Sequence, residues 1–239
     1  MNPDLTGDEA DVRAKLADGT VLLYMRYFGI RPFTDEFLLS RRESGRDIIL
    51  VEDRTHDVIV PRAEGGFTPD AVLASLRKWA ALPEGGMLRT DMGSCAAGVD
   101  ARFGDTRREV MEMKVRYLET WEPELKREFL DKLHNAERLL DESGEPRGMS
   151  AGYEALLRRV DFTMLLAKRR ANAARLKERL SLLDGTRLRF LSGHPEESTL
   201  YFPVYLENRG EVQRAMAQHG VYCPVIWPEP EAAHGVCEV

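Results

Sequence analysis

Four side chains between residues 53 and 78 have the chemistry of a catalytic or cofactor site. Asp53 and His56 follow a continuous apolar run at residues 48–51, and Ser75 and Lys78 follow a shorter run at residues 71–74. In open α/β sheets, ligands bind beyond the carboxyl ends of the strands, so a carboxylate at such a position points toward a candidate crevice. A lysine sheltered near strand ends can have a lowered pKa and can form an imine as a nucleophile.

Both segments also have ordinary structural interpretations. An acidic residue after a strand is a common turn former, and Lys78 beside Arg77 can be a solvated charge on a basic turn. The spacing Ser-x-x-Lys at residues 75–78 matches the nucleophile motif of penicillin-binding proteins and class A β-lactamases as well. Those enzymes also need a Lys-Thr-Gly strand and a Ser-Asp-Asn type loop, and this sequence has neither. We therefore set the β-lactamase interpretation aside.

The elements that would position these side chains are short strands joined by helices. Apolar runs without alternation are typical of strands covered on both faces in a mostly parallel sheet. Such runs occur at residues 21–25, 47–51, 71–74 and 86–88. Residues 34–42 can form a crossover helix between the first two strands, with Thr34 as its N-cap. This half of the chain predicts an α/β fold.

The remainder predicts helices, a linker and a small α/β unit. Thr106 and Glu109 have the spacing of a capping box at a helix start, and Pro123 would stop or kink that helix. We expect a second helix with apolar residues on one face over 125–140, a linker at 143–148 and one basic helix over 153–183. The expected end of the chain is a strand at 187–191, a strand at 199–206, a helix at 209–219 and a strand at 221–227. Cys223 would be buried in that last strand.

Length and composition limit the classes of function. At about 150 residues per domain, 239 residues predict a main domain with a smaller attachment. The balance of 34 Lys and Arg against 40 Asp and Glu gives a net charge of −6, which argues against a nucleic-acid partner. No apolar stretch reaches the roughly 18 residues of a membrane span.

The cysteines and histidines form no recognisable framework. Three scattered cysteines suit neither a disulfide pattern nor a metal site. The histidines lie too far apart for a local metal motif; they include His134, His194, His219 and His234. Because the N-terminal segment is also acidic, unlike a signal peptide, we predict a cytoplasmic protein with no metal, nucleic-acid or membrane partner.

Several stretches together resemble one enzyme family. They are Tyr-Phe-Gly at 27–29, Glu-Asp-Arg-Thr-His at 52–56, Ser-Leu-Arg-Lys at 75–78 with Gly-Gly at 85–86, and Tyr-Cys-Pro-Val-Ile-Trp-Pro at 222–228. In this order they resemble the fold-type I enzymes that depend on pyridoxal 5′-phosphate (PLP), and most nearly the DegT-type (DegT/StrS) aminotransferases. The resemblance extends roughly from residue 21 to the C-terminus.

The resemblance implies a role for each candidate residue. Asp53 would pair with the pyridine nitrogen and keep it protonated, so that the ring can accept the electrons of a substrate carbanion. His56 would contact the ring near its 3-hydroxyl, and Ser75 would bind the phosphate. Lys78 would be the Schiff-base lysine and the proton shuttle. Arg77 is either a phosphate or substrate contact or a surface charge.

The implied reaction moves an amino group from a small-molecule amino donor to a keto acceptor, which in many relatives is a keto-sugar. Family members hold the PLP phosphate with a glycine-, serine- and threonine-rich turn at a helix N-terminus, and no such turn precedes Val21. The resemblance therefore implies the interior of a longer enzyme, truncated at its N-terminus and its C-terminus. Residues 1–148 would be a partial PLP-binding large domain, and residues 149–239 an incomplete small C-terminal domain.

Such a partial large domain would leave apolar sheet surface uncovered unless another chain covers it. We therefore expect a homodimer or a completing chain. The alternative is a non-catalytic remnant or partner subunit, which keeps the fold but lacks the phosphate-binding turn.

Overall fold

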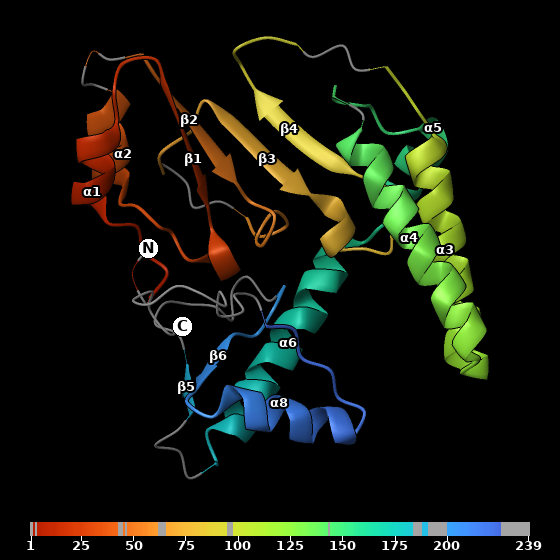
Figure 1. Cartoon of the computed structure of the whole chain (residues 1–239). Helices are drawn as coiled ribbons and strands as arrows, with labels where there is room; N and C mark the ends of the chain where they lie inside the picture. The colour runs from red at the N-terminus through yellow and green to blue at the C-terminus, as the bar shows by residue number, and fades with distance from the viewer. Residues whose placement is uncertain are drawn as a thin grey trace.

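The computed structural model of the chain describes most of its length. The described residues are 2, 4–42, 45, 47–61, 66–94, 98–142, 144–183, 188–190 and 200–225. They form a four-stranded sheet, a pair of long helices and a smaller unit built from the later elements (Figure 1). The predicted mixed α/β class is confirmed.

The main sheet is mostly parallel. Its strands are β1 (Thr20–Met25), β2 (Ile48–Asp53), β3 (Ala71–Ser75) and β4 (Gly86–Thr90), in that spatial order. β1, β2 and β3 run parallel, and β4 pairs antiparallel with β3. The apolar runs in the sequence therefore located all four strands and the dominant direction of pairing.

One face of the sheet, here called the covered face, packs against α1 (Glu9–Lys15) and α2 (Asp35–Arg42). Leu50 is fully buried there, and Phe37 and Leu38 of α2 belong to the same apolar cluster. Thr34 caps α2, as predicted, because its hydroxyl accepts a hydrogen bond from the Phe37 amide (3.1 Å). The crossover helix between β1 and β2 is thus fixed at its first turn.

The opposite side of the sheet, here called the open face, is poorly covered in the part of the chain that the structure describes. Val21 is 57% exposed, Leu23 61% and Leu88 59%. Successive strand residues point to opposite faces, so Asp53, Leu73 and Ser75 share this side. The prediction of uncovered apolar sheet surface is confirmed, and the expectation that these strands are covered on both faces is wrong for the described residues.

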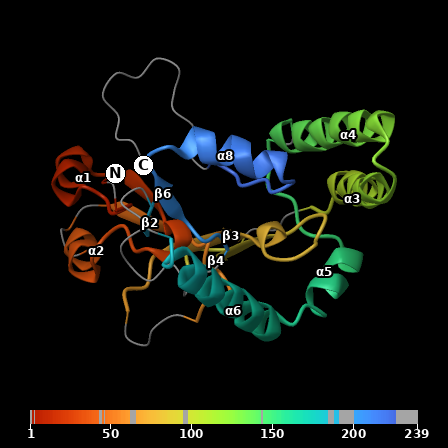
Figure 2. The same cartoon turned by 90° about the horizontal axis from the view of Figure 1, so that it is seen from below.

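Two long helices, α3 (Arg102–Thr120) and α4 (Pro123–Asp141), pack side by side. Figure 2 shows them at the opposite end of the molecule from α1 and α2. Pro123 occupies the first turn of α4, so the predicted stop before it is confirmed. Thr106 is not an N-cap: α3 begins four residues earlier, and the Thr106 hydroxyl donates to the Arg102 carbonyl within the helix (2.7 Å).

The expected single basic helix is two helices, α5 (Ala151–Leu157) and α6 (Phe162–Leu180). Asp161 separates them, because its carboxylate accepts a hydrogen bond from the Met164 amide (2.8 Å) and caps α6. The prediction of one continuous helix was wrong because the charge pattern concealed this cap.

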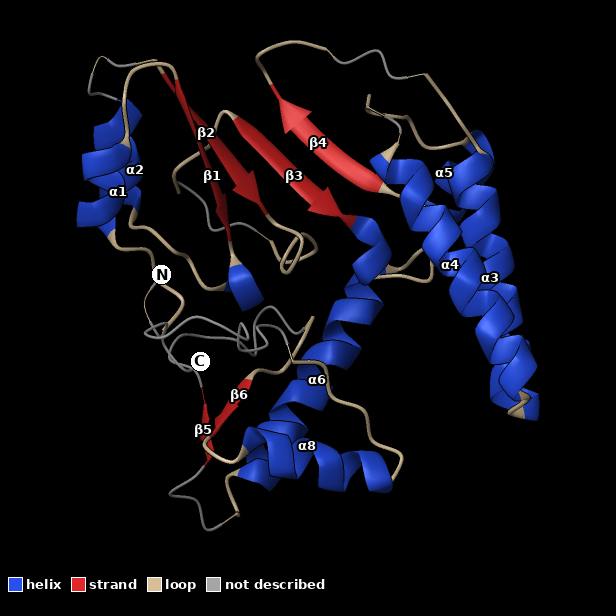
Figure 3. Ribbon diagram, viewed as in Figure 1, coloured by secondary structure: helices blue, strands red, loops and turns tan. Residues whose placement is uncertain are grey.

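The later elements form a small unit of β5 (Leu188–Phe190), β6 (Val204–Leu206) and α8 (Arg209–Gln218). β5 and β6 pair antiparallel. Figure 3 shows this unit and α6 on the side toward which the arrows of β1, β2 and β3 point. Residues 221–225 form no strand, and Cys223 is exposed, so both predictions there were wrong. The Cys223 carbonyl accepts from the Gln213 side chain (3.0 Å) instead of a neighbouring strand. Residues 226–227 lie outside the described part.

Candidate functional site

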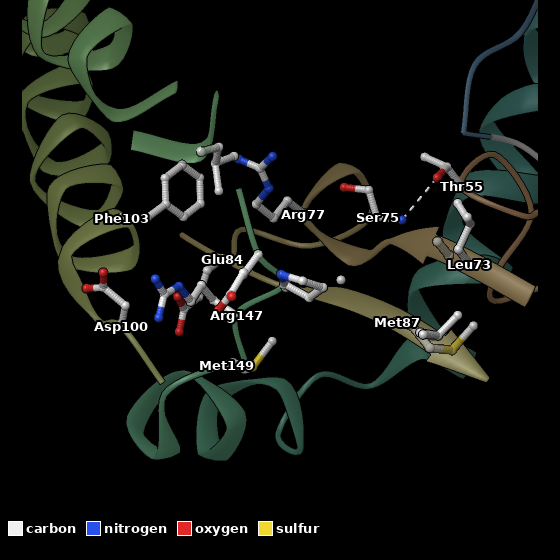
Figure 4. A pocket seen from close by; sticks show the side chains of 18 of the residues that line it. Thr55, Leu73, Ser75, Arg77, Glu84, Met87, Asp100, Phe103, Arg147 and Met149 are labelled. Carbon is white, nitrogen blue, oxygen red and sulfur yellow. Dashed lines mark hydrogen bonds between the residues drawn. The ribbon is translucent and has the colours of Figure 1, made fainter. Parts of the chain in front are cut away.

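Asp53 and Ser75 lie at the ends of two adjacent parallel strands. Asp53 is the last residue of β2, Ser75 is the last residue of β3, and Asp53 is in register with Leu73. Both line a cavity of about 990 Å³, within the roughly 300–1,000 Å³ typical of ligand pockets. Figure 4 shows Ser75, Thr55 and Leu73 at one end of this cavity. Two of the four predicted side chains therefore share one candidate site.

The loop after β2 links these two strand ends through Thr55. The Thr55 amide donates to Asp53 Oδ1 (2.7 Å), and Thr55 Oγ1 accepts from the Ser75 amide (3.0 Å; Figure 4). The Thr55 carbonyl accepts from the indole Nε1 of Trp79 (2.7 Å). Thr55 is buried and lines the cavity. Sequence reasoning quoted Thr55 only as part of a motif and assigned it no role.

His56 is not among the residues that line the cavity. It is only 5% exposed, and its Nδ1 accepts a hydrogen bond from the Phe28 amide (3.3 Å), which puts the proton of the neutral ring on Nε2. Its ring contacts those of Tyr27, Phe28 and Tyr201, with centroids 5.7, 5.3 and 5.4 Å away.

The surroundings of His56 also keep it uncharged. Burial and, to a lesser degree, the nearby Lys78 ammonium lower the pKa of the imidazole, the Asp53 carboxylate opposes them, and together they bring this pKa from 6.5 to about 4. The histidine is therefore neutral at pH 7, and its charge environment includes both the predicted acid and the predicted amine.

Lys78 ends the short 3-10 turn η2 (Leu76–Lys78), which directly follows β3. Its side chain is exposed, and Lys78 is not among the residues that line the cavity. Its backbone is held close by, because the Trp79 amide donates to the Leu76 carbonyl (3.0 Å) and the Trp79 side chain is buried. The structure thus brings the lysine to the rim of the site rather than into the cavity.

The far end of the cavity consists of residues that sequence reasoning did not single out. Figure 4 shows Asp100, Phe103 and Arg147 there. The buried Glu84 accepts a hydrogen bond from the Ser150 amide (2.7 Å) and so ties the segment before β4 to the start of α5. Glu84 precedes the quoted Gly-Gly pair, but no local pattern marks Phe103 or Arg147, because separate elements bring them to this wall.

Arg77 lies along the same cavity and is held by α3 and α4. Its guanidinium lies over the Phe103 ring at 5.0 Å and pairs with Glu137 at 3.6 Å, and Arg107 pairs with the same carboxylate at 3.1 Å. Arg77 is therefore half-buried and lines the cavity, rather than being a freely solvated surface charge.

A buried ion cluster stabilises the loop that carries Thr55 and His56. Asp57 pairs with Arg26 and with Arg54, at 3.2 Å in each case, and its side chain is 1% exposed. Arg54 also donates to the Val60 carbonyl (2.8 Å). Burial lowers the pKa of Arg26, and the Asp57 carboxylate opposes that shift. The two guanidiniums around one carboxylate fix the path of the loop beyond β2.

The described part of the chain contains neither a cluster of metal-ligating side chains nor a membrane-spanning helix. No group of three or more His, Cys, Asp or Glu side chains there could hold a metal ion, and His194 and His234 lie outside the described residues. None of the described helices is both long and apolar enough to cross a membrane.

Comparisons with known proteins yield no relative. No protein-family model matches the sequence, and no curated protein or solved structure matches the chain at a significant level. The structure alone defines an α/β protein that has a cavity at the strand ends of a mostly parallel sheet.

Proposed function

We propose that this chain is a PLP-dependent, aminotransferase-like protein built as part of a DegT-type fold-type I enzyme. The observation that carries the proposal is that Asp53 and Ser75 end adjacent strands and line one cavity, while Lys78 stands in the turn that follows Ser75. PLP needs a carboxylate for its ring nitrogen, donors for its phosphate and an amine for its aldehyde. Residues 1–148 would belong to the PLP-binding large domain of that fold and residues 149–239 to its small C-terminal domain.

The donors and acceptors in the cavity fit such a cofactor. The Thr55 amide binds Asp53 Oδ1, which leaves Oδ2 to accept from a protonated ring nitrogen. Ser75 precedes η2 without capping it, so its hydroxyl can donate to a phosphate oxygen. Bound PLP would supply an electron sink for a substrate carbanion. Asp53 would hold the proton on the ring nitrogen.

His56 and Lys78 would act from outside the set of residues that line the cavity. As the family resemblance implies, a neutral His56 would contact the ring near its 3-hydroxyl. Lys78 has a flexible four-carbon stem, so its amine could turn into the cavity to bind the aldehyde carbon. Once substrate replaces it there, the same amine would move the proton at the substrate Cα.

The amino group would pass from a small-molecule donor to a keto acceptor. A keto-sugar is the acceptor that the family resemblance favours. Arg77, half-buried along the cavity, would neutralise an anionic part of cofactor or substrate.

The second candidate is a non-catalytic remnant or partner subunit of the same fold. Two observations favour it: Lys78 is exposed outside the cavity, and Val21 and Leu23 expose apolar surface on the open face. In this version the open face would be covered by a second copy or by a completing chain, and a second copy would not supply a phosphate-binding turn, because both copies lack it.

Adding PLP and recording the visible spectrum separates the two candidates. For the catalytic proposal we expect a yellow absorbing species that borohydride fixes to the Lys78 peptide, as mass spectrometry would detect. Lys78→Ala should abolish the band, and Asp53→Asn should weaken it by removing the partner of the ring nitrogen.

Lys114→Ala is the matched control, because Lys114 is an exposed lysine on α3 and does not line the cavity. Its spectrum should equal that of the wild type. No visible band in the wild type at millimolar PLP would overturn the catalytic proposal and support the remnant. Labelling that is equal at Lys78 and Lys114 would also overturn it, because it would be adventitious.

A further inference from the structure

Thr55 makes three hydrogen bonds, and each reaches a different part of the candidate site. Its amide donates to the Asp53 carboxylate (2.7 Å), its hydroxyl accepts from the Ser75 amide (3.0 Å), and its carbonyl accepts from the Trp79 indole (2.7 Å). The residue is 5% exposed. Through its side-chain hydroxyl and its backbone carbonyl, this buried residue joins the loop after β2 to Ser75 and Trp79, which lie far along the sequence.

The hydrogen bond between the Thr55 hydroxyl and the Ser75 amide lies just past the last paired residues of β2 and β3. The register of the two strands ends at Asp53 with Leu73, and the Arg54 amide makes one more bond, to the Leu73 carbonyl (2.8 Å). Ser75 lies two residues farther on, and its only strand partner is Gly86 of β4. The Thr55 hydroxyl therefore replaces a backbone acceptor and keeps the end of β3 against the end of β2.

The Thr55 carbonyl acts on the other side, through Trp79. Trp79 is 2% exposed and directly follows Lys78, so its indole bond to Thr55 anchors the end of η2. Arg169 of α6 lies over the same indole, 5.4 Å from its centroid, and its Nη1 donates to the Leu200 carbonyl (3.4 Å). The turn that carries Lys78 is thus held between Thr55 in the loop after β2 and Arg169 of α6.

We propose that Thr55 is a positioning residue that sets the spacing of the Asp53 carboxylate, the end of β3 at Ser75 and the turn that carries Lys78. The proposal rests on the proposed PLP function for its consequence in binding, but the geometry belongs to the chain without any ligand. Removing the hydroxyl takes away the acceptor of the half-buried Ser75 amide. The end of β3 can then move away from Asp53.

The test compares Thr55→Val, which keeps the shape and loses the hydroxyl, with Thr55→Ser, which keeps the hydroxyl. Amide hydrogen exchange is measured on the ligand-free chain across residues 71–79. Loss of one hydrogen bond should speed exchange at Ser75 by on the order of tenfold in Thr55→Val, and exchange in Thr55→Ser should be close to that of the wild type.

Trp79→Phe is the second variant, because it removes the indole donor and keeps an aromatic ring at this buried position. It should leave the Ser75 amide protected and should slow the borohydride-trapped labelling of Lys78 by PLP. Thr55→Val should weaken PLP binding, also by on the order of tenfold, and Thr55→Ser should restore it. Thermal unfolding of each variant checks that the fold is retained. If Thr55→Val does not fold, the hydrogen exchange and the Lys78 labelling of Trp79→Phe still decide whether Thr55 anchors η2.

The outcomes separate this inference from the proposed function. If the wild type gives no visible band with PLP, the proposed function fails, whereas the exchange measurements still decide whether Thr55 joins the two strand ends. Equal Ser75 exchange in Thr55→Val and Thr55→Ser overturns the inference, and so does PLP binding that is unchanged in Thr55→Val. Unchanged Lys78 labelling in Trp79→Phe overturns the part that concerns η2.

Discussion

The same strands build both faces of the four-stranded sheet, yet the two faces are covered very differently. On the covered face, Leu50 is fully buried beneath α1 and α2, with Phe37 of α2 in the same apolar cluster. On the open face, Leu23 of the neighbouring strand remains 61% exposed, and Asp53 and Ser75 line the cavity. Both candidate groups for binding therefore occupy the face that contributes less to the core.

This difference separates the residues that hold the fold from the residues that could bind a ligand. β2 is apolar on both sides, with Ile48 and Leu50 on one face and Ile49 and Val51 on the other. Apolar groups left in water gain nothing from the hydrophobic effect, so the exposed side chains of the open face contribute little to the stability of the sheet. The covered face can keep the strand ends rigid while the open face receives a ligand or a second chain.

The largest effect that tests this contrast is expected for Leu50→Ala. Because Leu50 is fully buried, the substitution removes apolar contacts and leaves a cavity. It should lower the free energy of unfolding by about 2–5 kcal/mol. Urea unfolding followed by circular dichroism measures this value.

Leu23→Ala is the matched substitution on the open face, with the same change of side chain on the adjacent strand. It should alter the free energy of unfolding by less than about 0.5 kcal/mol, because Leu23 is mostly solvated already. If Leu23→Ala instead lowers the free energy of unfolding as much as Leu50→Ala at high protein concentration and has no effect on dilution, that result would contradict an open face in solution. It would indicate that a second copy covers this surface.

A change in stability smaller than that of Leu50→Ala is expected from the protonation of His56, whose ring contacts Tyr201 of the later part of the chain. Burial and the Lys78 ammonium lower the pKa of His56 from its ordinary 6.5 to about 4. Between these values the unfolded chain binds a proton that the folded chain does not. The contribution to stability is therefore complete above pH 6.5 and is lost as the pH falls toward 4. Its size should be roughly 2 kcal/mol, allowing for some solvent screening.

The pH dependence of unfolding for the wild type and His56→Gln checks this expectation. The variant should show a flatter stability profile across that window. His134→Gln is the control, because His134 is exposed on α4. The same slope in the wild type and in His56→Gln would show that the imidazole titrates alike in the folded and unfolded chains.

The sheet and one wall of the site could be predicted from the sequence, because local patterns determine them. Continuous apolar runs located β1 to β4, and strand ends are where polar side chains gather in such sheets. Asp53 and Ser75 could be placed together because adjacent parallel strands end at the same edge of the sheet. The pairing of Thr55 with Ser75 depends on the path of the loop beyond β2, which no local pattern specifies.

The other features that the sequence did not predict also depend on contacts between distant segments. His56 is buried because Phe28, Tyr27 and Tyr201 converge on it from distant segments. The exposure of Lys78 depends on the orientation of η2, which the Trp79 indole sets through Thr55. Thr106 matched the capping-box spacing, but α3 had already begun at Arg102. Short motifs describe possible bonds, whereas packing between distant segments decides which bonds form.

A loss smaller than that expected from His56 tests the attachment of the helix that closes the covered face. Thr34 accepts from the Phe37 amide (3.1 Å), and its hydroxyl donates to Glu9 Oε1 (2.9 Å), so it caps α2 and ties that helix to α1. Thr34→Ala should lower the free energy of unfolding by about 1 kcal/mol. Thr106→Ala should change it little, because the Thr106 hydroxyl only donates back into α3. Chemical unfolding of both variants measures the difference, and equal losses would mean that α2 is not anchored at Thr34 and that the covered face is held by its apolar contacts alone.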